Sequence, residues 1–167
     1  MRKFLGIFLV AVAAFSFSVC SFAQGLKIGY VDTIKVFNEY QRTKEQDKQL
    51  EAKKEKAKEN LEAREKEIQK IQSRLEVLKE GKQEAERAKL QEKMGEYRDV
   101  RQKELTDIKK ERDEMMKDII EDIDQTIKDY AKKNNYDLVV NGNSVLYGVE
   151  SNDLTDKVLT IINKKYK

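Results

Sequence analysis

Residues 42–133 contain no proline and only two glycines, and their apolar side chains recur at alternating spacings of three and four residues. This spacing places one narrow apolar stripe on a helix, and such a stripe packs against a second helix. The first series is Leu50, Lys54, Ala57, Leu61, Arg64, Ile68, Ile71, Leu75 and Leu78. The second is Leu90, Met94, Tyr97, Arg101, Leu105, Ile108, Arg112, Met115, Ile119, Ile123, Ile127 and Tyr130. Most of the chain must therefore form long helices that meet along a narrow seam.

One glycine separates the two series. It is Gly81, in the segment "KEGKQE". Two seams of similar length on either side of a glycine predict an antiparallel helical hairpin with its tip near residue 81. At about 1.5 Å per residue, each helix of roughly forty residues would reach about 60 Å. We expect residues 42–133 to form a coiled-coil arm that is much longer than a globular core requires. We also expect Ile108, Met115, Ile119 and Ile123 to pack the two helices together.

Charged residues make up 39% of the chain, a value that would fit disorder if the apolar residues were not periodic. The formal net charge of +3 includes Arg2 and Lys3, and subtracting these two leaves about +1 for a chain without its N-terminal segment. A nearly neutral total with so many charges indicates paired, solvated faces. It disfavours a nucleic-acid-binding surface.

The N-terminal side of the arm begins with a strand pattern. In "LKIGYVD", Leu26, Ile28 and Tyr30 alternate with their neighbours, and Asp32 can cap a helix that starts near Thr33. This predicts a strand, a turn and a short helix over residues 24–41.

The C-terminal side, residues 134–167, changes from helix to strand composition. The runs 138–140 and 145–147 are β-branched and aromatic, and the intervening Asn-Gly at 141–142 favours a tight hairpin turn. Asp153 can cap a closing helix that has Val158 and Ile162 on its apolar side. We expect two antiparallel strands followed by a helix.

The two end segments form a small head. Together they hold roughly fifty residues. The hydrophobic core of so small a unit is usually marginal in stability unless a disulfide, a metal or another subunit supports it. Three short strands also leave exposed edges. The sequence predicts an α+β fold that is mostly α, in which each head contributes three strands to a barrel shared between subunits. The helical arm is inserted between residues 41 and 134.

The first 23 residues resemble a secretory signal peptide. Arg2 and Lys3 precede an apolar stretch, and Ser21 and Ala23 give a cleavage-like ending, so we expect cleavage after Ala23 and export to the periplasm. A retained membrane anchor and lipidation of Cys20 are less favoured alternatives that stay open.

Most catalytic chemistry is excluded by composition. The chain has no histidine, and its only cysteine, Cys20, is lost with the signal peptide. Thiol and imidazole nucleophiles and Cys/His metal sites are therefore absent from the exported sequence. A site made of carboxylates alone would need a pocket that charged helices seldom offer. We expect no enzymatic activity and no cofactor.

The end segments resemble a known family. The chain is similar to the Skp (OmpH-like) periplasmic chaperones in the order of its segments. These are the signal peptide, "KIGYVDTIKVF", two charged helices with a glycine near the tip, "YDLVVNGNSVLYG" and "DLTDKVL". The resemblance implies a homotrimer with a shared β-barrel body. It also implies that three arms enclose a cavity for unfolded outer-membrane β-barrel proteins, without any nucleotide.

Carried over by position, the resemblance places nine residues in the trimer body: Ile28, Tyr30, Val31, Leu138, Val139, Val140, Val145, Leu146 and Tyr147. For contact with the unfolded client protein, the helical stripe leaves Tyr97 and Val100 as candidates. The basic arm tip of the family is not reproduced, because the lysines and arginines near residue 81 are almost balanced by glutamates. Binding of lipid is therefore in doubt, and weak contact with a membrane surface stays open.

The sequence thus predicts an ATP-independent periplasmic holdase that prevents aggregation of unfolded outer-membrane proteins. The alternative is a structural coiled-coil spacer or adaptor of the periplasm. The terminal strand segments distinguish the two, because a spacer needs none.

Overall fold

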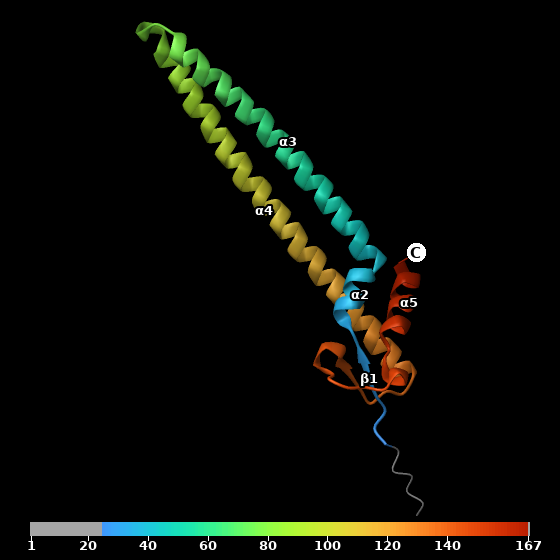
Figure 1. The fold of residues 1–167 in the computed structure, drawn as a ribbon. Helices are drawn as coiled ribbons and strands as arrows, with labels where there is room; N and C mark the ends of the chain where they lie inside the picture. Colours follow the sequence, from blue (N-terminus) through green and yellow to red (C-terminus); the bar gives the residue numbers. More distant parts are fainter. Residues whose placement is uncertain (1–24, 167) are drawn as a thin grey trace, which may run out of the picture.

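The computed structural model describes residues 25–166, so the predicted signal peptide and Cys20 lie outside the described residues. Along the chain come β1 (Ile28–Val31), α2 (Thr33–Glu39), α3 (Gln41–Val77), α4 (Glu80–Lys133), β2 (Leu138–Asn141), the short 3-10 helices η2 (Gly142–Ser144) and η3 (Glu150–Asn152), and α5 (Thr155–Tyr166). Figure 1 shows α3 and α4 running side by side away from a small head, which both ends of the described chain build. Within residues 25–166, no helix is both long enough and apolar enough to cross a bilayer.

The turn at the arm tip lies slightly before the predicted position. Leu78 and Lys79 are both extended, with φ of -80° and -66°, and Gly81 lies in the first turn of α4. Neither residue needs a positive φ, so no glycine is required at the break. The side-chain amide of Gln83 donates to the carbonyl oxygen of Leu78 at 2.8 Å. This contact satisfies a carbonyl that the end of α3 leaves without a helical partner.

The lower end of α4 belongs to the core of the head. Met115, Ile119 and Ile123 are buried in one apolar cluster whose other members come from β1, α2, α5 and the residues that flank them: Val31, Val36, Tyr40, Leu154, Val158 and Ile162. The prediction that these three α4 residues pack the two arm helices together is incomplete: this part of α4 lies beside the start of α3, where Arg42 pairs with Asp118 and Asp122, but the three residues also pack against α2 and α5. Ile108, the fourth residue of the predicted set, faces α3 along the arm. The head core thus includes a helix segment that the sequence pattern assigned to the arm.

The two strands of the head pair in parallel. Ile28 lies opposite Leu138, and Val31 lies opposite Asn141. The predicted antiparallel hairpin between 138–140 and 145–147 is therefore wrong for this chain, and within residues 25–166 the sheet has two strands. β2 follows the C-terminal end of α4, which lies in the head, and pairs with β1. The whole arm is therefore the connection between two neighbouring strands.

Gly142 explains why the Asn-Gly pair does not form the hairpin turn. No glycine among the described residues has a positive φ, which the expected turn requires. Instead, a Cβ atom at position 142 would lie 3.0 Å from the backbone nitrogen of Asp32. The side chain of Asn141 accepts from the N–H of Asn143 at 3.0 Å and starts η2. Glycine is needed here for close packing against the chain after β1.

The predicted helix starts in the head are confirmed. Asp32 accepts a hydrogen bond from the N–H of Lys35 at 2.9 Å, which caps α2. Asp153 accepts from the N–H of Thr155 at 2.9 Å, just before α5. The hydroxyl of Thr155 in turn accepts from the N–H of Asp32 at 2.9 Å, so the two helix starts are linked.

Tyr40 should give the head a measurable sensitivity to alkaline pH. Its ring is 3% exposed, its hydroxyl donates to Asp122, and burial together with the charge of Asp122 raises the pKa of Tyr40 to about 12. A phenol whose pKa is higher in the folded state stabilises that state fully below pH 10, and this contribution disappears as the pH rises through about 12. The lost stability should be about 2 to 3 kcal/mol.

Urea unfolding followed at pH 9, 10, 11 and 12 tests this expectation. The Tyr40→Phe variant is the matched control, and its stability should fall less over the same range. Equal slopes for the two proteins would show that Tyr40 titrates normally.

Candidate functional site

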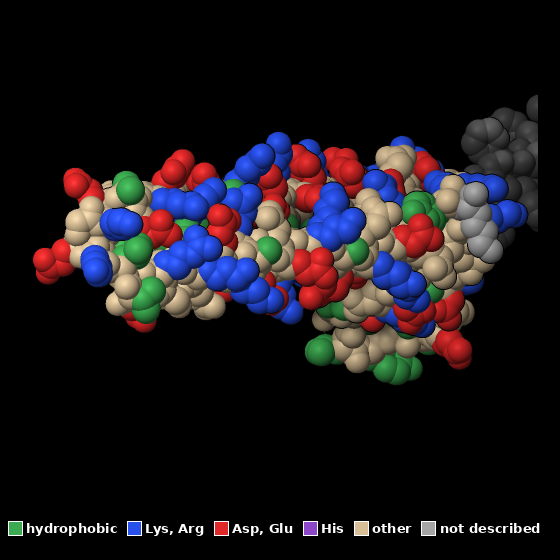
Figure 2. All heavy atoms as spheres, turned by 90° about the horizontal axis from the view of Figure 1, so that it is seen from above, with side chains coloured by type: hydrophobic (Ala, Val, Ile, Leu, Met, Phe, Trp, Pro, Cys, Tyr) green, Lys and Arg blue, Asp and Glu red, His purple; other side chains and the backbone are tan. Residues whose placement is uncertain are grey.

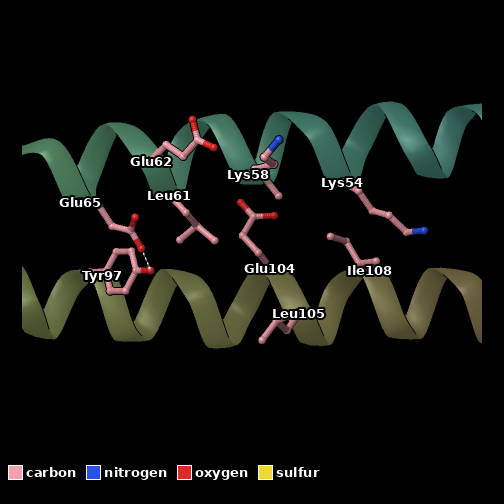
Figure 3. Close-up of a pocket in the computed structure, with 10 residues that line it drawn as sticks. Lys54, Lys58, Leu61, Glu62, Glu65, Tyr97, Glu104, Leu105 and Ile108 are labelled. Carbon is pink, nitrogen blue, oxygen red and sulfur yellow. Dashed lines mark hydrogen bonds between the residues drawn. The ribbon is translucent and has the colours of Figure 1, made fainter.

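The seam between α3 and α4 is not fully closed by its own side chains. An open groove of about 440 Å³ lies between the helices, as Figure 3 shows. Its lining comprises Lys54, Ala57, Lys58, Leu61, Glu62, Glu65, Tyr97, Glu104, Leu105 and Ile108. The predicted apolar stripe does lie between the two helices, but in the middle of the arm its side chains leave an open groove instead of forming a tight interface.

The lining of the groove combines apolar side chains with charged ones. Leu61 of α3 and Ile108 of α4 point toward the opposite helix, and so does the carboxylate of Glu104 (Figure 3). Tyr97 crosses the seam, where its hydroxyl donates to Glu65. Leu105 remains 56% exposed although it belongs to the predicted stripe. Apolar surface is therefore available on the arm beside groups that keep it hydrated.

Only a few arm residues are fully buried. In α3 above the head these are Leu50, Ala57 and Ile71. Ion pairs across the seam include Lys53 with Glu111, and Arg64 with Glu96 at 3.8 Å. Each exposed pair of this kind contributes little, with a median of about 0 to 1 kcal/mol. The arm is thus a helix pair with sparse packing along much of its length.

The surface of the arm carries both signs of charge. In Figure 2, Lys and Arg side chains alternate with Asp and Glu side chains, and hydrophobic side chains appear only in small separate spots. Near the tip, Arg74 lies 3.9 Å from Glu86, so a basic side chain there has an acidic partner. The face shown therefore presents no extended single-sign surface, as the near-neutral composition predicts.

The head exposes a second apolar surface. A groove of about 400 Å³ between α2 and α4 is lined in part by Ile34, Phe37, Met116 and Ile120. Another groove, of about 410 Å³, runs along β2. Both linings include Thr33, Asp124 and Asn141, so the two grooves are continuous. We call this continuous surface the head face.

Large apolar side chains on the head face remain open to solvent. Ile34 is 58% exposed, Ile120 is 49% exposed and Leu138 is 50% exposed. So much apolar exposure on so small a head is unusual for a surface that stays in water, and it marks an interaction site.

The residues predicted for the trimer body differ in their surroundings. Val31 is buried in the core of its own chain, and Tyr30 is half-buried with Gly148 packed against its ring. Val139, Val140 and Val145 are half-buried, and Ile28 and Leu138 are exposed. Leu146 and Tyr147 are almost fully exposed, at 106% and 87%. All except Val31 thus keep some surface for another molecule.

The predicted client contacts also differ. Tyr97 lines the arm groove, whereas Val100 is half-buried outside that lining. The sequence reasoning missed Ile34, Met116 and Ile120 of the head face. A signal for two of them existed in the doublets Met115-Met116 and Ile119-Ile120. The first residue of each doublet enters the core, so the second lies about 100° away on another face of α4.

Comparison with known proteins agrees with this architecture. The family model described as outer membrane protein (OmpH-like) matches residues 27–162. A crystal structure from Caulobacter crescentus CB15, of a protein provisionally described as an outer membrane chaperone (OmpH-like), superposes with a TM-score of 0.76 at 12% sequence identity. The superposition covers 90% of this chain and 91% of that chain. No curated protein matches significantly in sequence. Because the family model spans nearly all of the described residues, the chain belongs to the OmpH-like outer membrane protein family.

Proposed function

We propose that this protein is an ATP-independent holdase of the periplasm that keeps unfolded outer-membrane β-barrel proteins from aggregating. Family membership supports a chaperone role, as does the similarity to a structure described as an outer membrane chaperone. The observation that carries the proposal is the arm, which has a charged exterior and an open seam with exposed apolar side chains such as Leu105.

The open seam fits weak, multiple binding. Leu61, Leu105 and Ile108 each offer an apolar contact of about 1 kcal/mol or less, because only part of each side chain can be removed from water by a client. Many such contacts along a long arm restrain a polypeptide without selecting one conformation. A client that folds exposes fewer apolar groups and dissociates, so release needs no nucleotide.

We further propose that three heads associate through the head face. A two-stranded sheet is marginal alone, and here its only further pairing among the described residues is a single bridge from Tyr30 of β1 to Asp153. Edge strands readily pair with another chain. The segment 145–147 lies outside the sheet of its own chain, with Leu146 and Tyr147 exposed. It is therefore available as the third strand, beside the sheet edge of a neighbouring subunit. The arms would then project together and border a cavity.

Dilution of a urea-unfolded outer-membrane β-barrel protein into buffer with the purified protein, without nucleotide, tests the function. We expect light scattering by the client to be suppressed at equimolar amounts of chaperone trimer. A protein that leaves aggregation unchanged would be a structural spacer or adaptor instead.

The arm contacts are tested by the double variant Met94→Gln/Leu105→Gln. Both side chains are exposed, at 42% and 56%, so the helices should remain intact. Loss of two apolar contacts should weaken client binding by on the order of tenfold. Fluorescence titration with a labelled client measures the affinity.

Lys103→Gln, on the exposed surface of the same helix, is the control for the double variant and should bind normally. If the double variant and the control bind equally well, clients are not held by the arm seam.

A further inference from the structure

Asn141 is the only asparagine of the chain that is followed by glycine. In a flexible peptide, the backbone nitrogen of the following residue attacks the side-chain amide carbon of asparagine, which makes asparagine chemically labile. Glycine has no Cβ atom and hinders this attack least. The pair does not form the hairpin turn that it favours in isolation, so its conformation in the head decides whether the reaction can occur.

The reaction is a deamidation and needs water as its only co-reactant. The nitrogen of Gly142 loses its proton and bonds to Cγ of Asn141, the bond from Cγ to the amide nitrogen breaks, and ammonia leaves with the proton. Water then opens the cyclic imide. Opening at Cγ gives aspartate. Opening at the former backbone carbonyl gives isoaspartate, whose main chain runs through the side chain and is longer by one methylene.

The folded head holds both ends of the Asn141 amide. Its Oδ1 accepts from the N–H of Asn143 at 3.0 Å, and its Nδ2 donates to the hydroxyl of Thr33 at 3.1 Å. Ring closure also requires the bond from the backbone carbonyl carbon to the next nitrogen to eclipse the Cα–Cβ bond. The ψ of Asn141 is 126°, which directs the nitrogen of Gly142 away from Cγ. The reaction therefore needs a large rotation about the Cα–C bond of Asn141.

The surroundings of Gly142 oppose this rotation. A Cβ atom at this glycine would lie 3.0 Å from the backbone nitrogen of Asp32 and 3.2 Å from the carbonyl carbon of Val31. The N–H of Asp32 in turn donates to the hydroxyl of Thr155, where α5 begins. Rotation at Asn141, which pairs with Val31 in the sheet, would move Gly142 out of this contact and detach the end of β2 from β1. The pair can thus reach the reactive conformation only when the head opens.

We propose that Asn141 is a deamidation site that the folded head keeps unreactive, so that isoaspartate forms only in chains whose head has opened. An isoaspartyl residue lengthens the backbone at the end of β2 and shifts Gly142 out of its contact with Asp32. The new carboxylate lies on the head face, whose lining already includes Asp124. A chain that is modified while open therefore cannot restore the original head, and the opening is recorded irreversibly.

Incubation of the purified protein at pH 8 and 37 °C tests the protection. A synthetic peptide of residues 138–146 gives the unprotected rate in the same buffer. Peptide mapping by mass spectrometry measures the conversion of Asn141, with fragmentation that distinguishes isoaspartate from aspartate. We expect conversion in the folded protein to be slower than in the peptide by on the order of tenfold or more, because the rate falls with the population of the open state.

Two variants separate opening of the head from local motion of the turn. Ile119→Ala removes a fully buried side chain from the head core, so it should raise the population of the open state. Its deamidation should be faster than that of the unchanged protein by on the order of tenfold or more, up to the peptide rate. Val77→Asp, at the exposed arm tip, is the control and should react like the unchanged protein.

The effect of the modification is measured on chains that were deamidated in guanidinium chloride, returned to buffer and separated by ion exchange. The isoaspartyl chains should unfold at a lower urea concentration than unmodified chains treated in the same way. Asn141→Asp is the matched variant, because it carries the charge without the added methylene. Its unfolding midpoint should lie closer to that of the unchanged protein.

Three results would overturn the proposal. Equal rates in the folded protein and the peptide would show that the head gives no protection. Equal rates in Ile119→Ala and the unchanged protein would show that the turn reacts by local motion, without opening of the head. Isoaspartyl chains that unfold like unmodified ones would show that the head tolerates the product. None of these measurements involves a client protein, so their outcome is independent of the proposed holdase function.

Discussion

Replacing Ile119 by alanine is expected to destabilise the head by about 2 to 5 kcal/mol, as for other buried Ile-to-Ala changes. Ile119 is fully buried in the core cluster that joins α4 to α2 and α5. A domain has about 5 to 15 kcal/mol of stability in total, so the variant should lose a large part of the stability of its head and unfold at a lower urea concentration. The arm helices pack elsewhere and should retain much of their helical signal.

Urea unfolding followed by tyrosine fluorescence and by far-ultraviolet circular dichroism measures this effect, because the head holds most of the tyrosines and the arm most of the helix. Ile120→Ala is the matched control. The side chain of Ile120 is 49% exposed, so the change should alter unfolding of the single chain by less than about 1 kcal/mol. Equal losses at both positions would contradict the described core.

Replacing Leu138 by aspartate is expected to convert the proposed trimer into monomers. Leu138 lies on β2 in the head face and is 50% exposed in the single chain, so a charge at this position stays hydrated while the chain is alone. In a subunit interface the same charge would be buried without a partner, at a cost of several kcal/mol in each subunit. Sedimentation velocity at micromolar concentration distinguishes the two states.

Val77→Asp is the control for this experiment. Val77 ends α3 at the arm tip and is 83% exposed, so the variant should sediment like the unchanged protein. A Leu138→Asp variant that remains trimeric would place β2 outside the subunit contacts. An unchanged protein that is itself monomeric would refute the trimer.

The arm was predictable because the spacing of apolar residues within each helix is enough to indicate it. Apolar spacing in one helix is enough to place its seam, and the positions from Leu50 to Ile71 lie as the pattern indicates. The pattern does not tell which partner covers the seam. Met115 and Ile119 have the same spacing as the arm residues, yet they also contact the head, because α2 and α5 pack against α4 beside the first turns of α3.

The hairpin was not predictable from local preference. An Asn-Gly pair favours a tight turn in isolation, but here Gly142 packs against Asp32, a residue more than one hundred positions earlier. Contacts of that range outweigh the propensity of two residues. The head face was missed for a related reason. The exposure of Ile34 and Ile120 depends on how α2 and α4 cross, which no single segment reveals.

The parallel pairing of β1 with β2 has a consequence for the order of folding. Lys27 and Asp137, which join the two strands at one end, are 110 positions apart. Closing so long a loop from a random coil is slow, whereas a helical hairpin forms from neighbouring contacts and brings its two ends together. Pairing of α3 with α4 thus brings β2 close to β1, and the two strands can then pair. A chain that emerges N-terminus first cannot complete its sheet before the whole arm has appeared.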